Sequence, residues 1–283
     1  MGFRLSYVGS RSRGLNYNMA INKPQPSLTT FTQARRPYPR FGQGILRDDG
    51  GRSSYHALQA KVERRLSAGL SFLASYAYGK SMDDVSSDIG GSVQDPRNFD
   101  AEWAVSDFDI THNLVVSGLY ELPVGEGKPW LSTGPASRVL GGWQVGAIVQ
   151  VRSGLPFTPR ISVDQANTGT PQRPNRIASG KLDDPTLLQW FDPSAFTLPA
   201  SFTYGDSGRN ILRGDNYVNV DMVLSKTQRL FGRTALQFRA EAFNLFNHAN
   251  YGLPNAVVNT ATAGRVLSAS DPRILQFGLK LTF

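Results

Sequence analysis

The chain has 283 residues, of which 40% are hydrophobic and 18% charged, and it contains 28 Gly, 17 Pro and no Cys. This composition argues against a coiled coil or helical bundle, and the lack of Cys excludes disulfide frameworks, thiolate metal sites and cysteine nucleophiles. The net charge of +8 comes from basic residues spread along the chain, a distribution that argues against nucleic acid as a partner.

Apolar and polar residues alternate with a period of two in eight separate segments. In a strand, this pattern places the apolar side chains on one face and the polar ones on the other. No segment has the 18 consecutive apolar residues of a membrane helix, and the only helix we expect is a short one at residues 182–191, inside a loop. The predicted strands include residues 3–7, 58–64, 70–78, 114–122, 143–151, 218–224, 236–242 and 275–283.

The connections between these strands alternate between short and long. Compact soluble domains rarely carry several structureless loops of more than about 15 residues, whereas outer-membrane barrels combine short periplasmic turns with long extracellular loops. If the C-terminus is periplasmic, every short connection falls on the periplasmic side. The short connections are at residues 67–68 and 230–233, with a link of moderate length at residues 123–140, and the long ones are residues 10–53, 83–108, 154–214 and 247–271.

Together these patterns predict an all-β fold, an antiparallel transmembrane β-barrel segment of about eight meandering strands that spans residues 1–283. A closed barrel satisfies every backbone hydrogen bond without water. A soluble sandwich would show the same alternation, but aromatic residues near strand ends favour a barrel with interfacial girdles. These aromatic residues are Tyr55, Tyr78, Tyr120, Trp143, Tyr217, Phe246 and Phe283.

The last eleven residues, RILQFGLKLTF, resemble the C-terminal strand of outer-membrane barrels. Such strands end in an aromatic residue that follows apolar residues at alternate positions. The resemblance implies that the barrel-assembly machinery reads this strand and is therefore a partner of the chain. The residues at the matching positions are Leu275, Phe277, Leu279, Leu281 and Phe283.

Seven further stretches, in order along the chain, resemble the Oar-like TonB-dependent receptors, also known as carboxypeptidase-regulatory-like-domain proteins. The resemblance implies location in the cell outer membrane and a role in energised uptake of a bulky solute. It covers only the C-terminal part of such receptors, without signal peptide, N-terminal domain or plug domain, so we expect a fragment whose full-length form engages TonB and a plug. The stretches are SYVGSRSRGL, RRPYPRFG, SSYHALQAKVERRLSAGLSFLASYAYGKSMDD, QDPRNFDAEWAVSDFDITHNLVVSGLYELPVG, LGGWQVGAIVQVRSGLPFTP, GRNILRG and LQFRAEAFNLFNHANYG.

Two other classes of protein are alternatives. Eight strands can close on themselves with side chains filling the interior, which would give a membrane anchor or surface-binding protein, although the 44- and 61-residue loops and the missing leader argue against it. A soluble β enzyme lacks a catalytic constellation, since the three His lie in different elements and no phosphate loop or nucleophile elbow occurs. We therefore expect no enzymatic activity, cofactor or metal.

Three polar residues of the strand at 236–242, Gln237, Arg239 and Glu241, are candidates to face the barrel lumen. Arg239 and Glu241 could contact a solute or hold a plug, although a solvated wall with cross-strand pairing is the simpler interpretation. Outer-membrane lipid and lipopolysaccharide are the expected partners at the surface, because arginine matches phosphate geometry. The basic residues of the first loop that could meet these phosphates include Arg11, Arg13, Arg35, Arg36 and Arg40.

Eight acidic residues fall within 27 residues of the second long loop. Oxygen ligands at this density could bind Ca²⁺, but no EF-hand spacing is present. We therefore favour a solvated extracellular loop over a calcium site. The residues are Asp83, Asp84, Asp88, Asp95, Asp100, Glu102, Asp107 and Asp109.

Overall fold

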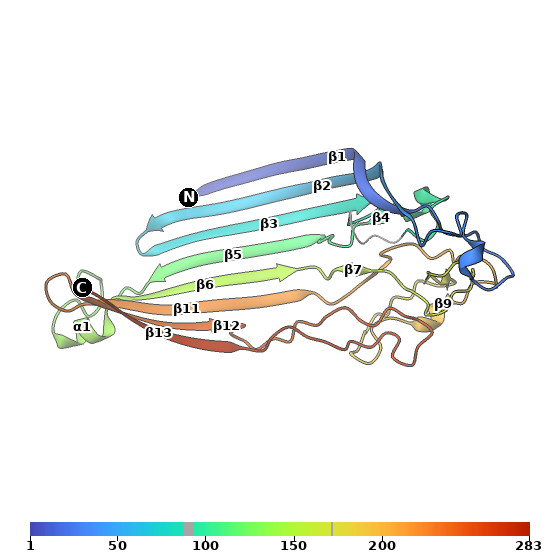
Figure 1. Ribbon diagram of the computed structural model, residues 1–283. Helices are drawn as coiled ribbons and strands as arrows, with labels where there is room; N and C mark the ends of the chain where they lie inside the picture. Colours follow the sequence, from blue (N-terminus) through green and yellow to red (C-terminus); the bar gives the residue numbers. More distant parts are fainter. Residues whose placement is uncertain (88–92, 171) are drawn as a thin grey trace.

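The computed structural model describes residues 1–87, 93–170 and 172–283. Eight long strands form one antiparallel meander, in which each strand pairs with the next long strand of the chain (Figure 1). Within the described residues the sheet is open, with β1 at one edge and β13 at the other. The strands are β1 (Gly2–Ala20), β2 (Ile45–Ser67), β3 (Leu70–Asp83), β5 (His112–Glu121), β6 (Trp143–Arg152), β11 (Tyr217–Arg229), β12 (Ala235–Phe243) and β13 (Ile274–Thr282).

All eight predicted strands are present, so the predicted antiparallel all-β fold is confirmed. The four long connections leave one end of the sheet, and the three short ones leave the other (Figure 1). The tightest turn joins β2 to β3 through Ala68 and Gly69, which both have positive φ, 51° and 79°. Two consecutive residues of this kind match the twist of the flanking strands.

The first hairpin is longer than the sequence predicts, because β1 and β2 span 19 and 23 residues. The predicted loop at 10–53 therefore shortens to residues 21–44. The extension has few apolar residues, and its register shifts between Arg13 and Leu15 and again between Leu15 and Tyr17. These irregularities interrupt the alternation that identifies a strand in the sequence.

The expected helix at residues 182–191 is absent, and that prediction was wrong. Thr186 and Gln189 exchange backbone hydrogen bonds of 3.0 and 3.1 Å, and the Trp190 amide donates to the Gly264 carbonyl at 2.8 Å. Contacts with distant segments thus satisfy the amides that a helix would pair locally. Phe191, 1% exposed, belongs to a small apolar cluster in the loops with Phe157, Ala195, Phe196 and Leu212.

The remaining elements are short and lie in the connections. The six-residue α1 (Pro135–Leu140), which the sequence does not predict, lies between β5 and β6. No helix of the described residues has the length and apolar content needed to cross a membrane. The others are β4 (Ala104–Val105), β7 (Pro156–Phe157), β8 (Asn175–Arg176), β9 (Phe196–Thr197), β10 (Leu212–Arg213) and 3₁₀ turns at Gln33–Arg35, Phe99–Glu102 and Pro193–Ala195.

The register aligns apolar side chains across the sheet on its convex face. Val116 of β5 lies opposite Ala74 of β3 and Val149 of β6. Val149 in turn lies opposite Val220 of β11. Since successive side chains point to opposite faces, a slip of one residue would bring polar side chains such as Ser117 or Asp221 into this apolar row.

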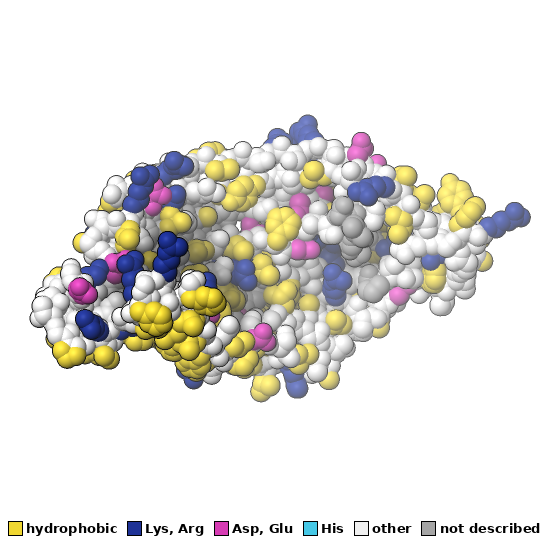
Figure 2. Space-filling view, turned by 60° about the vertical axis from the view of Figure 1, so that its left-hand side comes forward, with side chains coloured by type: hydrophobic (Ala, Val, Ile, Leu, Met, Phe, Trp, Pro, Cys, Tyr) yellow, Lys and Arg dark blue, Asp and Glu magenta, His cyan; other side chains and the backbone are white. Residues whose placement is uncertain are grey.

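The concave face carries most of the polar and charged strand residues, together with apolar ones such as Leu73 and Val223. Its residues include Ser117 of β5, which lies opposite Ile148 of β6, and Asp221 of β11, which lies opposite the same Ile148. Gln237, Arg239 and Glu241 share one face of β12 and lie opposite Lys280, Gly278 and Gln276 of β13. The space-filling view shows the hollowed side of the molecule, where acidic and basic side chains are interspersed with apolar ones (Figure 2).

The aromatic residues near the strand ends divide between the two faces, so the expected girdle is incomplete. Tyr78, Tyr120 and Trp143 share the face of the apolar row, whereas Tyr55 and Tyr217 share the polar face by register. On the polar face, the Arg152 guanidinium lies 4.4 Å from the Tyr217 ring centroid. This cation–π contact explains why an aromatic residue stands at that concave position.

A pair of neighbouring substitutions tests which face meets hydrocarbon. Val149→Arg should destabilise the protein by about 2–4 kcal/mol, because it places a charge on the apolar face near the middle of the sheet. Ile148→Arg is the matched control, since Ile148 is 51% exposed on the concave face and lies opposite Asp221. Urea unfolding in lipid vesicles measures both, and equal losses would contradict the assignment of the faces.

Candidate functional site

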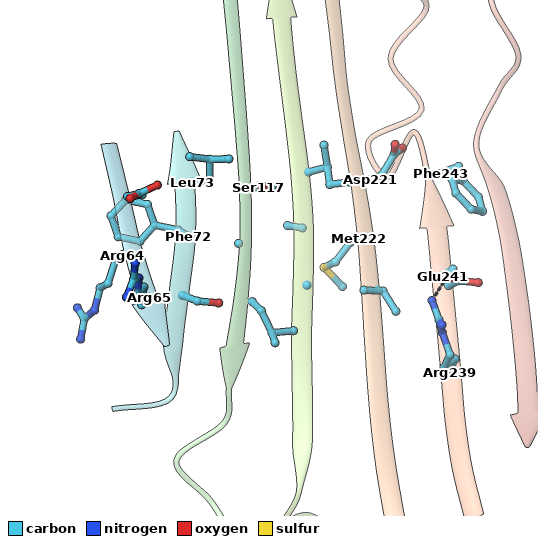
Figure 3. Close-up of a pocket in the computed structure, with 18 residues that line it drawn as sticks. Arg64, Arg65, Phe72, Leu73, Ser117, Asp221, Met222, Arg239, Glu241 and Phe243 are labelled. Carbon is cyan, nitrogen blue, oxygen red and sulfur yellow. Dashed lines mark hydrogen bonds and ion pairs between the residues drawn. The ribbon is translucent and has the colours of Figure 1, made fainter. Parts of the chain in front are cut away.

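A cavity of about 760 Å³ lies against the concave face (Figure 3). Charged residues border it on opposite sides, from β2 and from β11 and β12, while the strands between contribute Ser117, Gly118 and Gly146 as a flat wall. These small residues leave space between the charged groups, while Leu73, Leu119 and Ile148 of the central strands add apolar surface to the lining. The charged residues of the lining are Glu63, Arg64, Arg65, Asp221, Arg239 and Glu241.

Two of the three predicted lumen residues, Arg239 and Glu241, line this cavity, while Gln237 lies on the same face outside the lining. Arg239 Nη2 and Glu241 Oε1 are 2.5 Å apart. Because Arg239 is 49% exposed, the pair contributes little to stability. The Asp221 carboxylate accepts hydrogen bonds of 2.9 Å from the Asn219 side chain and the Asn244 amide. The side of the cavity formed by β11 and β12 thus offers two carboxylates and one guanidinium to a bound solute.

The C-terminal strand residues occupy the open edge of the sheet, where β13 pairs with β12 alone among the described strands. Their side chains share one face and alternate with Gln276, Gly278 and Lys280. All of them are exposed: Leu275, Phe277, Leu279, Leu281 and Phe283.

Four carboxylates of the acidic second loop are buried, so the interpretation as a solvated loop was wrong for these four. Asp83, Asp84, Glu102 and Asp109 are between 1% and 3% exposed. Each has an arginine partner from a distant segment, so a guanidinium replaces water around the carboxylate. Asp88 lies outside the described residues.

Two of these arginines come from the GRNILRG stretch of the third long loop. The Arg209 guanidinium binds the carboxylates of both Asp83 and Asp107, the latter at 3.2 Å. Arg213 binds the carboxylate of Asp109. The sequence alone assigned this stretch no structural function, so its function in linking two loops was missed.

Two further pairs complete the network. Arg173 Nη1 lies 2.7 Å from Glu102 Oε2, and both side chains are less than 10% exposed. Arg52 of β2 contacts Asp84 at 2.9 Å and Asp100 at 2.8 Å. Within the described part of the chain, no group of three or more His, Cys, Asp or Glu is arranged to hold a metal ion. The four buried carboxylates among those that suggested calcium are therefore bound by arginine.

Arginines of the first loop also serve internal contacts. Arg35 donates to the carbonyls of Gln25, Thr29 and Asn167. Arg36 donates to the Asn22 carbonyl at 2.9 Å. Both guanidinium groups are hydrogen-bonded to backbone carbonyls and hold the loop together. This argues against the expected phosphate contacts at these two positions.

These features define a β-barrel protein of the outer membrane. Residues 1–276 match the family described as "Outer membrane beta barrel domain", and the chain belongs to this family. Among solved structures, the chain is similar to the outer membrane transporter YddB from Escherichia coli, with a TM-score of 0.50 and 10% sequence identity. The match covers 98% of this chain and 30% of the transporter. The comparison with curated proteins gave no match.

Removing one arginine tests whether the ion pairs fix the loops. Arg209→Met should destabilise the loop contacts by about 3–5 kcal/mol, because Asp83 would stay buried without a counter-charge. Limited proteolysis should then cleave the loops between β3 and β5 and between β6 and β11 faster. Arg265→Met, at an exposed arginine of the fourth loop, is the matched control. Cleavage at the wild-type rate in Arg209→Met would contradict the role of this residue.

Proposed function

We propose that the chain is part of the barrel wall of an Oar-like TonB-dependent receptor that takes up a bulky solute across the outer membrane. The open sheet is the observation that carries this proposal. Its edge strands β1 and β13 have one long partner each among the described strands, and unpaired backbone groups cost several kcal/mol each in hydrocarbon. Strands from the rest of a longer receptor would pair with both edges and close the barrel.

Two comparisons support this proposal. The chain matches 30% of an outer membrane transporter over 98% of its own length, as expected for one section of a large barrel. The seven stretches that resemble Oar-like receptors run from Ser6 to Gly252. In such a receptor, the charged wall residues Asp221, Arg239 and Glu241 would pair with the plug domain, and TonB would drive the rearrangement of that plug.

The surface and the C-terminus have separate functions in this proposal. The barrel-assembly machinery reads the C-terminal strand. Arg11 and Arg13 share a strand face with Leu5 and Tyr7 but lie closer to the loop end of β1. This position supports the proposal that they contact lipopolysaccharide phosphates, and the exposed Arg40 is a third candidate. We propose no catalytic function and no bound cofactor.

A self-closing eight-stranded barrel is the second candidate. An even number of antiparallel strands leaves β1 and β13 running in opposite directions, so the two edges could pair with each other. Such a barrel would act as an anchor or surface-binding protein. The second candidate therefore differs from the first in one contact, between β1 and β13.

Engineered disulfides distinguish these two candidates, since the chain has no Cys of its own. Leu279→Cys with Phe238→Cys is the positive control, because these residues lie opposite each other on β13 and β12. Leu279→Cys combined with Phe3→Cys, Leu5→Cys or Tyr7→Cys should form no disulfide in native outer membranes. The polypeptide should also migrate far above 31.0 kDa. A β1–β13 disulfide in a polypeptide of 31.0 kDa would overturn the receptor proposal.

Truncation of the last aromatic residue tests the assembly signal. Phe283→Ala should lower the amount of heat-modifiable barrel in the outer membrane several-fold, because the terminal ring is the end of the proposed signal. Phe246→Ala is the control, since Phe246 is an exposed aromatic residue after the end of β12. Both variants are measured by boiled and unboiled immunoblots. A normal amount of Phe283→Ala would contradict the assignment.

A further inference from the structure

A second cavity, of about 380 Å³, lies among the loops. Its wall combines residues from the first hairpin, the acidic loop and the long loop between β6 and β11. Within the described residues, its lining contains no aromatic ring and few apolar side chains. A ligand here would be held by hydrogen bonds and charge, not by stacking.

Two cations of this cavity, Lys23 and Arg160, form no ion pair among the described residues, and Lys23 is the buried one of the two. Lys23 is 4% exposed, and its Nζ donates to the Gln94 carbonyl at 2.5 Å. It also lies 5.3 Å from the Tyr204 ring centroid. Among the described residues, no carboxylate oxygen forms an ion pair with it. Burial lowers its pKa to about 8, although the more distant charges of Asp95, Asp164 and Glu102 act to raise it. An ammonium group buried in this way gains stability when an anionic oxygen binds beside it.

Three further polar atoms of the same lining are buried without a hydrogen-bond partner among the described residues. They are Thr170 Oγ1, Gln172 Oε1 and Arg173 Nε. Gln172 and Arg173 are 3% and 8% exposed, so each unpaired atom costs free energy unless a ligand or water satisfies it. They supply one guanidinium donor, one amide acceptor and one hydroxyl.

The charges of the lining limit the charge of the ligand. Four cationic residues face three carboxylates, a surplus of one positive charge, and the acidic residues already bind arginines. One negative charge would balance this set, whereas a dianion such as phosphate would meet repulsion from the carboxylates. The charged residues are Lys23, Arg160, Arg173 and Arg209, with Asp84, Glu102 and Asp107.

We propose that this cavity binds a small hydroxylated carboxylate, of the size and chemistry of a sugar acid. The carboxylate lies between Lys23 Nζ and Arg173 Nε. Ligand hydroxyl groups bond to Thr170 Oγ1 and Gln172 Oε1. This inference rests on the proposed uptake function. It names the class of substrate that binds at the loops before uptake.

The test is calorimetric titration of the purified intact receptor in detergent with D-glucuronate, D-glucose and inorganic phosphate. Glucuronate should bind at least about tenfold more tightly than glucose, because it adds a charge-assisted hydrogen bond. Phosphate should compete poorly. Equal affinities for glucuronate and glucose, or tighter binding of phosphate, would overturn the proposal. Since no TonB is present, a failure here leaves the receptor assignment itself untouched.

Two variants locate the ligand, and one serves as control. Lys23→Met should abolish the preference for glucuronate over glucose. Thr170→Val should weaken both sugars by a similar factor, because it removes a hydroxyl and no charge. Lys181→Met makes the same chemical change at an exposed lysine outside the cavity lining and should bind like the wild type. An unchanged preference in Lys23→Met would place the anion elsewhere.

Discussion

Each strand of this sheet can offer only one of its faces to hydrocarbon, and the pairing register decides which face that is. The register brings Val116, Val149 and Val220 into one row, and turns polar residues such as Ser117 and Asp221 to the opposite face. Because lipid supplies no hydrogen bonds, the same pairs must also satisfy the backbone. The apolar exterior and the polar wall depend on this alignment. So does the arrangement of the long loops at one end of the sheet and the short turns at the other.

Local alternation was sufficient to predict the sheet, because a strand can be recognised from the apolar and polar pattern of neighbouring residues. Leu275 to Phe283 show the pattern without interruption, and β13 forms there. The prediction failed where the pattern is interrupted or where distant contacts decide. The extension of β1 carries two register shifts, and the amide of Trp190 pairs with Gly264 instead of a helical neighbour.

The candidate sites were only partly predictable for a related reason. Alternation placed Arg239 and Glu241 on the polar face, but the width of their cavity depends on small residues of other strands, such as Gly146. The arginine partners of the buried carboxylates lie at least 32 positions away, as with Arg52 and Asp84, and up to 126 positions away, as with Arg209 and Asp83. No local pattern gives such pairings, although acidic residues accumulating in one loop and arginines recurring in another were a usable signal.

The ion pair between Arg209 and Asp83 joins residues 126 positions apart in the chain. Contacts of such high sequence separation form late in folding, since the intervening chain must first be brought together. The strands between them therefore have to be paired before the loops can settle. During assembly the surface of this barrel matures last, and a nascent barrel with paired strands would still carry open loops at its outer end.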